Sequence, residues 1–301
     1  MKKYLVIDIG GTAIKYALMH EDGSFIDDCK GDVPTPMEGL DALLSAIDSF
    51  ASKYMDQVSG IAMSAPGRID NKTGYFYTAG ALSGYLCNVN LGNILKEKYG
   101  VPVAIDNDGK CAANAELWLG ALKDVDSGVI IGLGTGIAGG IILNRKLWRG
   151  IHGTSSEFSA LPTNYKDLSY QNFWANVNGV YGLLVPYATR KGIDVKDTNG
   201  RKFFDALHSG DEDAQVVFNE FISTLLVGIV GLQASLDVEK YCIGGGISAQ
   251  DTLIHAIQEA SHQFFKNAGP LPIIEPQIDR CAFNNDANLI GALRNYLDLY
   301  N

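Results

Sequence analysis

The chain has 301 residues, of which 47% are hydrophobic and 19% are charged, a composition typical of a globular protein with ample core. Its 24 Lys and Arg residues and 34 Asp and Glu residues give a net charge of −10. This charge argues against nucleic acid as the main partner, because phosphate backbones are bound through excess Lys and Arg. It leaves room for a nucleotide, whose few phosphates need only local amides, a cation and a metal ion.

Cysteine usage and apolar runs point to the cytoplasm. The five cysteines are scattered without a CxxC pair, which favours reduced thiols over a disulfide framework. Asp8 interrupts the N-terminal apolar run too early for a signal peptide. The longest apolar stretches, 129–143 and 221–236, are shorter than the roughly 20 residues of a membrane helix. We therefore expect a cytoplasmic protein without a membrane partner.

The first half of the chain alternates strands and helices, as in an α/β layer. Apolar spacing and turn residues define each element. The predicted elements are three strands within 1–30, a helix at 40–54, a strand at 58–64, a helix at 91–99, a strand at 101–105 and a helix at 109–120.

The second half repeats this alternation. It predicts a glycine-rich hairpin at 128–142, an irregular stretch at about 150–170, helices at 171–190, 200–208 and 212–236, a strand at 240–243, a helix at 250–267, a strand at 272–275 and a helix at 287–299. We therefore expect an N-terminal α/β lobe at 1–118 and a larger C-terminal α/β lobe at 119–286. The last helix, within 287–301, would pack back on the first lobe.

Each half contains an apolar strand, a glycine-rich turn and a second apolar strand. The first turn is Asp8-Ile-Gly-Gly-Thr12, and the second is Gly132-Leu-Gly-Thr-Gly136. Glycine lets the backbone turn sharply and approach a ligand, so that amide N–H groups can line an anion-binding nest. An ordinary hairpin would explain one such turn. Two copies suggest that two related halves close on one polyphosphate.

A second candidate site follows the predicted strand at 101–105, where the chain reads Asp106-Asn-Asp108. A carboxylate at a strand end can take a proton from a hydroxyl group as a general base. The neighbouring Asn107 can hydrogen-bond a ligand through both functions of its amide. Asp108 could equally be the N-cap of the following helix. The segment alone leaves these two interpretations evenly balanced.

In their order and spacing, these motifs resemble the ROK family (repressors, open reading frames and kinases) over essentially the whole chain. The resemblance rests on Asp8-Ile-Gly-Gly-Thr-Ala-Ile-Lys15, Ala65-Pro-Gly67, Asp106-Asn-Asp108, Gly132-Leu-Gly-Thr-Gly-Ile-Ala-Gly-Gly140 and Gly244-Gly-Gly-Ile-Ser248. It implies the two-lobed, ribonuclease H-like fold of sugar kinases, hsp70 and actin, with a ligand cleft between the lobes. It also implies phosphorylation of a sugar hydroxyl group by ATP with Mg²⁺.

The resemblance assigns roles to individual residues. Asp108 would be the catalytic base, and Asp8 would hold Mg²⁺ directly or through water. The sugar would contact Gly67, Asn107, Asp108 and Glu157. The nucleotide would contact Asp8, Gly10, Gly11, Thr12, Lys15, Gly134, Thr135, Gly136, Gly139, Gly244, Gly245 and Gly246. Three successive glycines at 244–246 also make a plain loop, and without the resemblance that interpretation would be preferred.

The chain departs from the family pattern beside Glu157. Zinc-containing members have Glu-x-Gly-His and a cysteine cluster, but here Glu157 precedes Phe-Ser and no cysteine lies between 112 and 241. We therefore expect no zinc site. Ala81 and Tyr85 stand where many members have Asn and Trp.

The missing histidine and asparagine would hydrogen-bond the reducing end of a hexose, so their loss implies a changed acceptor. The pattern resembles the β-glucoside kinase branch, so we expect the 6-hydroxyl group of a glucose-type sugar, with cellobiose as an example. Glucokinase, N-acetylmannosamine kinase and fructokinase are the alternatives within the family. The nearby aromatic residues could stack on an added sugar ring or could be ordinary core and surface residues: Trp148, Tyr165, Tyr170, Phe173 and Trp174.

Two further classes of protein share the family name. Repressors carry a helix-turn-helix segment before the sugar-binding part, and the phosphate loop at residue 8 leaves no room for one. A non-catalytic sugar-sensing regulator is the other alternative, but such a protein could lose Asp8, Asp108 or either loop. All are present, so an enzyme is favoured. The family also predicts a homodimer with a small-molecule sugar substrate.

Overall fold

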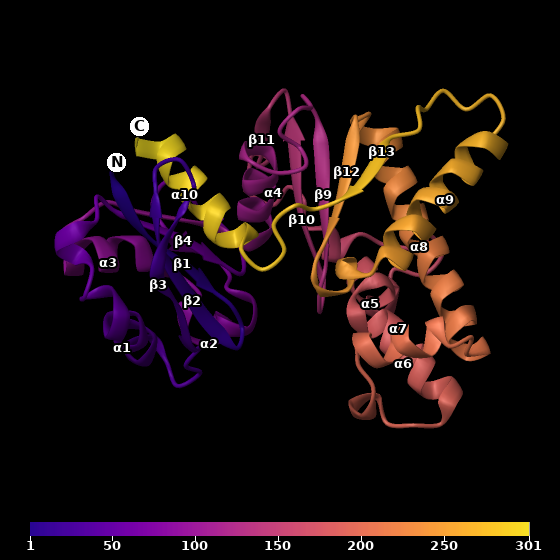
Figure 1. The fold of residues 1–301 in the computed structure, drawn as a ribbon, viewed down its shortest axis with the longest axis horizontal. Coiled ribbons are helices and arrows are strands. Elements are labelled where there is room, and N and C mark those ends of the chain that lie inside the picture. Colours follow the sequence, from indigo (N-terminus) through magenta and orange to yellow (C-terminus); the bar gives the residue numbers. More distant parts are fainter. Residues whose placement is uncertain (301) are drawn as a thin grey trace. The chain divides into compact units, whose positions relative to one another are not determined.

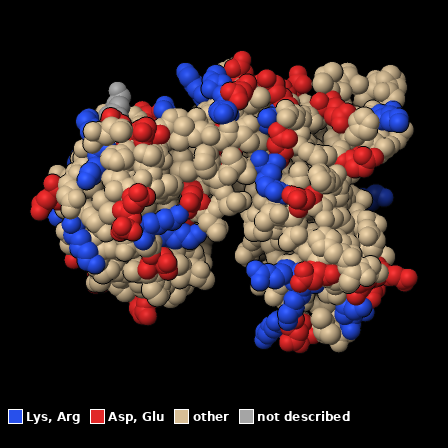
Figure 2. Space-filling view, in the orientation of Figure 1, with Lys and Arg blue, Asp and Glu red and all other residues tan. Residues whose placement is uncertain are grey.

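The computed structural model describes residues 1–300 and divides the chain into two compact units. Of the described residues, unit 1 comprises 1–123, 147–155 and 285–300, and unit 2 comprises Asp124–Lys146 and Ser156–Asn284. The boundary expected at 118 thus lies at Lys123, and the segment 147–155, expected in the C-terminal lobe, belongs to unit 1. Figure 2 shows Lys and Arg interspersed with Asp and Glu on the visible surface.

Unit 1 is built on a five-stranded sheet in the order β3-β2-β1-β4-β8. Strands β1, β2 and β3 are antiparallel neighbours, whereas β1, β4 and β8 are parallel. The elements of unit 1 are β1 (Lys3–Ile9), β2 (Ala13–His20), β3 (Phe25–Pro34), α1 (Leu40–Ala51), η1 (Met55–Gln57), β4 (Ile61–Ala65), β5 (Ile69–Asp70), β6 (Tyr75–Phe76), η2 (Gly80–Leu82), α2 (Ser83–Leu86), β7 (Val89–Asn90), α3 (Leu91–Tyr99), β8 (Val103–Asn107), α4 (Asp108–Trp118) and α10 (Ala287–Tyr300).

The side chains of β1 alternate between the two faces of this sheet. Leu5 and Ile7 belong to the core that α1 and α3 complete. Tyr4 points to the other face, where its ring lies 5.1 Å from that of Tyr296 in α10. Helix α10 runs beside α4 (Figure 1), and a Cβ atom on Gly291 would come within 1.6 Å of the Cys111 carbonyl oxygen. The C-terminal helix therefore packs closely on unit 1 because glycine occupies the crossing point.

Unit 2 repeats the pattern of the first sheet. Its strands follow the order β11-β10-β9-β12-β13, with β9 and β10 antiparallel and β9, β12 and β13 parallel. The elements are β9 (Gly128–Leu133), β10 (Ile137–Leu143), η3 (Phe158–Ala160), η4 (Tyr170–Asn172), α5 (Trp174–Asn178), α6 (Val180–Lys191), η5 (Val195–Asp197), α7 (Gly200–His208), α8 (Glu212–Leu236), β12 (Lys240–Gly244), η6 (Gly246–Ala249), α9 (Asp251–Asn267) and β13 (Gln277–Arg280). Strand β11 (Lys146–Trp148) is where the chain leaves unit 2.

Helix α8 has 25 residues and is long and apolar enough, by length and composition alone, to cross a membrane. Core helices pass the same test. Phe218, Phe221, Leu225 and Ile229 are buried in the core of unit 2, where α8 packs against α6 and α9. The apolar character of α8 is therefore accounted for in part by this core.

Two predicted elements are wrong. The helix expected at 171–190 is broken at Gly179, whose backbone is extended. Nearby carbonyl oxygens leave no room there for a Cβ atom. The strand expected at 272–275 does not form, and the partner of β12 is instead β13 at Gln277–Arg280. Pro272 and Pro276 both lack the N–H group that a ladder needs, and β13 begins directly after Pro276.

Candidate active site

The first glycine turn joins β1 to β2 in unit 1. The Gly10 amide donates to the Ala13 carbonyl oxygen at 3.0 Å, and a Cβ atom on Gly10 would meet that same oxygen at 3.0 Å. The Thr35 hydroxyl group donates to the Gly10 carbonyl oxygen at 2.7 Å and holds the turn from behind. Gly11 and Thr12 are exposed at its tip. The turn is thus fixed by its carbonyl groups while Gly11 and Thr12 lie at the surface.

Asp8 lies beside this turn with 7% of its surface exposed. Asn288 of α10 donates to its Oδ1 at 3.1 Å, and Lys15 faces it across the β1–β2 ladder. Burial raises the pKa of Asp8, while the Ser64 hydroxyl group, Asn288 and Lys15 act in the opposite direction. Asn288 lies 280 residues away along the chain, so no local sequence pattern signals this contact.

Asn107 and Asp108 mark the junction of β8 and α4. The cap of α4 is Asn107, whose Oδ1 accepts from the Lys110 amide at 3.1 Å. Its Nδ2 donates to the Gly67 carbonyl oxygen at 3.0 Å and to Asp108 Oδ1 at 2.9 Å. The alternative in which Asp108 is the N-cap is therefore wrong. Asn107 holds Asp108, and both amide functions of Asn107 already have protein partners.

The same junction is anchored by an ion pair between the buried Asp106 and the partly exposed Arg149, which sequence reasoning missed. Asp106 is 1% exposed, and its Oδ2 accepts from Arg149 Nη1 at 2.5 Å. Its Oδ1 accepts from the Asn107 amide at 2.9 Å. Arg149 Nη2 also donates to Asn295 of α10 at 2.9 Å. Three distant segments of unit 1 thus meet behind Asn107.

Gly67 has a conformation that only glycine adopts easily. Its φ is +102°, and a Cβ atom would lie 2.2 Å from the Thr78 carbonyl oxygen. This conformation places the Gly67 carbonyl oxygen where Asn107 reaches it. Gly67, Asn107 and Asp108 are therefore brought together at the carboxyl ends of β4 and β8.

The second glycine turn joins β9 to β10 in unit 2. The Gly134 amide donates to the Gly136 carbonyl oxygen at 3.0 Å, and Thr135 is exposed at the tip. Gly139 lies outside the turn, buried in β10, where a Cβ atom would be 2.2 Å from the Phe158 ring. Gly139 therefore makes room for a core side chain, and its expected contact with the nucleotide has no support in this placement.

The glycines after β12 serve a different purpose at each position. Gly244 is buried, and a Cβ atom there would lie 3.0 Å from the Cys281 sulfur atom. Gly245 has a φ of +88°, and a Cβ atom would lie 2.2 Å from the Leu133 carbonyl oxygen. Gly246 has open space around it. The close approach of Gly245 to β9 brings the chain after β12 beside the second turn.

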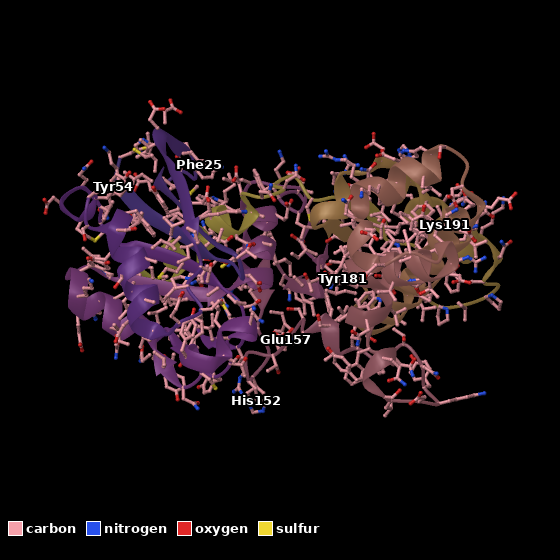
Figure 3. The ribbon with its side chains drawn as sticks, turned by 90° about the horizontal axis from the view of Figure 1, so that it is seen from below. Phe25, Tyr54, His152, Glu157, Tyr181 and Lys191 are labelled. Atoms are coloured by element: carbon pink, nitrogen blue, oxygen red, sulfur yellow. The ribbon has the colours of Figure 1, made fainter. Side chains whose placement is uncertain are left out.

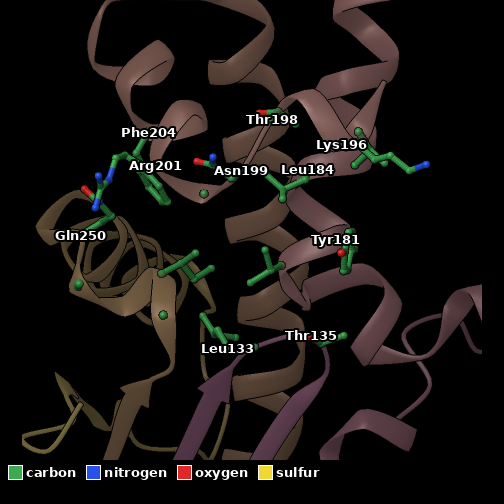
Figure 4. Close-up of a pocket in the computed structure, with 17 residues that line it drawn as sticks. Leu133, Thr135, Tyr181, Leu184, Lys196, Thr198, Asn199, Arg201, Phe204 and Gln250 are labelled. Carbon is green, nitrogen blue, oxygen red and sulfur yellow. The ribbon is translucent and has the colours of Figure 1, made fainter. Parts of the chain in front are cut away.

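These segments line a cavity of about 800 Å³ within unit 2. Figure 4 shows Leu133 and Thr135 on one side and Thr198, Asn199 and Arg201 across from them. The predicted wall residues are Gly134, Thr135 and Gly246, and sequence reasoning missed the walls from 180–184 and 195–204. Its size is within the range of small-molecule sites.

Thr198 is the notable group in this wall. It is 8% exposed, and its hydroxyl group has no hydrogen-bond partner among residues 1–300. A buried hydroxyl group without a partner costs free energy, so an unpaired one facing a cavity suggests a ligand contact.

Glu157 lies in unit 2 at the start of η3 and is exposed. The preceding Ser156 has a φ of +64°, uncommon for a residue with a side chain, and its hydroxyl group donates to the Gly139 carbonyl oxygen at 3.0 Å. This contact fixes the turn before Glu157. His152 belongs to unit 1, is exposed, and projects outward (Figure 3).

No group of three or more His, Cys, Asp or Glu side chains suited to a metal ion occurs among residues 1–300. Of the aromatic residues at 148–174, Trp174 is fully buried against Phe158, whereas Trp148, Tyr165 and Tyr170 are more than half exposed. Trp174 is therefore a core residue, and it cannot stack on a sugar.

Two sheets with the same strand order, each with a glycine turn after its first strand, define the fold of the sugar kinases, hsp70 and actin. The ROK family model matches residues 4–297, and the chain belongs to the ROK family.

Several relatives are named sugar kinases. A β-glucoside kinase of Listeria innocua is 32% identical over 98% of this chain and 97% of its own length. A putative N-acetylmannosamine kinase of Listeria monocytogenes has a similar structure, with a TM-score of 0.90, 29% identity, and coverage of 99% of this chain and 100% of that one. A ROK family protein of Streptococcus pneumoniae, solved in complex with sucrose, gives a TM-score of 0.89 and 30% identity, with 98% of each chain covered. The prediction of a carbohydrate kinase of this family is confirmed.

Proposed function

We propose that the protein transfers the γ-phosphoryl group of ATP to the 6-hydroxyl group of a glucose-type sugar, and that a β-glucoside such as cellobiose is an acceptor. The observation that carries this proposal is the placement of Asp108. Its Oδ1 accepts from Asn107 Nδ2 at 2.9 Å and from the Gly109 amide at 2.8 Å, while the helix cap is supplied by Asn107. A carboxylate so oriented suits a general base.

In the proposed reaction, Asp108 accepts the proton of the sugar hydroxyl group while the oxygen of that hydroxyl group bonds to the γ-phosphorus atom. The bond between that phosphorus atom and the β–γ bridging oxygen breaks, and ADP leaves. Asn107 keeps Asp108 in one orientation, which lowers the cost of aligning the reacting atoms. The amide groups at Gly11–Thr12 and Thr135–Gly136 suit the phosphate oxygens.

Magnesium fits the chemistry of the first turn. Asp8 offers a carboxylate, and Mg²⁺ commonly takes one or two carboxylates together with waters and substrate phosphates. When bound, Mg²⁺ would neutralise charge on the phosphates. The burial that raises the pKa of Asp8 penalises its ionised form, and a nearby cation relieves that penalty.

ATP is the proposed donor, with its nucleoside in the 800 Å³ cavity of unit 2. Thr135 and Gly134 place the second glycine turn in the wall of that cavity, so a bound nucleoside would have its phosphates beside the turn. The unpaired Thr198 hydroxyl group supports the assignment of a polar ligand.

The choice of a substituted sugar rests on the residues beside Glu157 and at 81. Ala81 is an exposed residue without a polar side chain, and Phe158, which follows Glu157, is buried in the core. Neither can hydrogen-bond a sugar. The relatives named β-glucoside kinase and the related structure holding sucrose, a disaccharide, support the same choice.

A coupled assay of ADP release with glucose, N-acetylmannosamine, fructose and cellobiose tests the proposal. We expect sugar-dependent release, with cellobiose among the substrates. Asp108→Asn should abolish turnover while sugar binding persists by calorimetry. Turnover that survives this substitution would refute the role of Asp108 as the base. Absence of sugar-dependent ADP release with all four sugars would refute the kinase assignment.

We also propose a cytoplasmic homodimer. All five cysteines are thiols rather than disulfides among residues 1–300, as expected in a reducing compartment. Val216 and Val227 are exposed on α8, and such residues suit a subunit interface. Light scattering of the purified protein, expected to give twice the mass of 32.4 kDa, tests the dimer.

A further inference from the structure

Unit 1 contains a second cavity, of about 470 Å³, whose wall includes cationic side chains. Its charged lining residues are Arg68, Lys72, Lys110 and Arg149 on the positive side and Asp70 on the negative side. Arg149 is paired with Asp106 and Lys110 is only 3% exposed, so the accessible charges are Arg68 and Lys72 against Asp70, a local excess of cations in a chain with ten more acidic than basic residues. Such a surface attracts anions.

Two segments joined by a hydrogen bond form this wall. The β5–β6 hairpin carries residues 68–72, and its turn is closed by a hydrogen bond from the Gly74 amide to the Asp70 carbonyl oxygen at 2.8 Å. The loop at 149–153 forms the other part, and Arg68 Nε donates to the His152 carbonyl oxygen at 2.9 Å. The cavity is therefore held by hydrogen bonds within one unit.

Arg68 is well placed to receive an anion. Its guanidinium carbon lies 4.1 Å from the centre of the Tyr77 ring, which fixes the plane of the group. Only Nε has a hydrogen-bond partner among residues 1–300, so the two terminal nitrogens can still donate. A fixed guanidinium edge suits the two oxygens of a carboxylate or phosphate.

The cavity adjoins the residues proposed to bind the acceptor. Arg68 follows Gly67, whose carbonyl oxygen accepts from Asn107 Nδ2 at 3.0 Å. Lys110 donates its amide to Asn107 Oδ1 at 3.1 Å, and its side chain lines the cavity. A sugar at Asp108 would thus have this cavity next to it.

We propose that the cavity binds an anionic group, carboxylate or phosphate, carried on the anomeric substituent of the acceptor sugar. This inference rests on the proposed function for the position of the sugar. It adds a preference for a charged acceptor over a neutral β-glucoside. The matched acceptors are cellobiitol and cellobionate, two open-chain compounds that differ in a carboxylate, and methyl β-glucoside and β-glucose 1-phosphate, which differ in a phosphate.

The test compares kcat/KM for the charged and neutral member of each pair. We expect a preference of about tenfold for at least one charged member at low salt, decreasing with ionic strength. The pair that shows the preference identifies the anion. Lys72→Gln combined with Arg68→Gln should reduce the preference to near one. The control is Lys53→Gln, an exposed lysine of unit 1 outside the cavity, which should leave it unchanged.

Equal kcat/KM values within both pairs would overturn the inference while leaving the kinase assignment intact. A preference that the double variant retains would also overturn it. Calorimetry of cellobionate and β-glucose 1-phosphate binding, without ATP, separates the two proposals. If no sugar were phosphorylated but binding of either anion depended on Arg68 and Lys72, the proposal of an anion site would be supported and the proposed phosphorylation would be refuted.

Discussion

Substitution of Asn107 tests whether this residue organises Asp108, the proposed catalytic base. Asn107→Ala removes the cap bond from the Lys110 amide, at 3.1 Å, and both Nδ2 contacts, to Gly67 and to Asp108. Losing an N-cap costs about 1 kcal/mol, and losing a hydrogen bond to a charged group costs about 1.5 to 3 kcal/mol. We expect the free energy of unfolding to fall by about 2 to 4 kcal/mol.

The same change should reduce turnover. Without its donor, Asp108 can leave the orientation in which it is proposed to meet the sugar hydroxyl group, and a loss of about 1.4 to 2.7 kcal/mol of alignment would lower kcat by about ten- to a hundredfold. The assays are urea unfolding and steady-state kinetics with the best sugar. Asn90→Ala is the matched control, because Asn90 caps α3 in the same unit by accepting from the Asn93 amide at 2.9 Å. It should lose about 1 kcal/mol of stability and keep its kcat.

Asn107→Asp separates the cap from the orientation. Aspartate caps helices as well as asparagine does, so much of the stability should return. The new carboxylate cannot donate to Asp108, and its charge disfavours the ionised form of that neighbour. The acid limb of the kcat/KM profile should therefore move to higher pH. If kcat in Asn107→Ala matched that of Asn90→Ala, Asn107 would be only a helix cap and the reasoning would be refuted.

Three further substitutions probe the site. Burial raises the pKa of Asp8 above its ordinary 3.8, so the native state binds this proton more tightly than the unfolded chain does, and the free energy of unfolding decreases as pH rises through the native pKa. Asp8→Asn should therefore raise the free energy of unfolding at pH 8, measured by urea unfolding, and should lower activity. Thr198→Val should increase the KM for ATP about three- to tenfold in steady-state assays without loss of thermal stability, since the hydroxyl group has no protein partner among residues 1–300. Arg149→Met should cost about 2 to 4 kcal/mol in urea unfolding by leaving Asp106 buried and unpaired, and adding Asp106→Asn should restore most of it.

The sequence predicted best where a local pattern decides the structure. The glycine turns, the helices at 200–208 and 212–236 and the strand at 240–244 follow from residues within one turn or ladder. Predicted helix boundaries were wrong where a contact with a distant segment determines the backbone conformation. Gly179 interrupts the helix expected at 171–190 because its backbone lies against the Thr135 carbonyl oxygen, which a Cβ atom would approach to 2.6 Å.

The candidate site shows the same limit in its chemistry. The sequence proposes Asp8 and Asp108 as site residues, but it could not assign the cap of α4 to Asn107, because asparagine and aspartate cap equally well. Nor could it show that Gly139 serves a core ring, since glycines for packing and glycines for phosphates look alike in a sequence. Asn288 and Arg149 reach Asp8 and Asp106 from segments far along the chain, and no periodicity signals a partner at that distance. The residues that orient Asp8 and Asp106 therefore come from tertiary packing, and substitution of Asn288 should affect activity through Asp8, whose carboxylate it contacts.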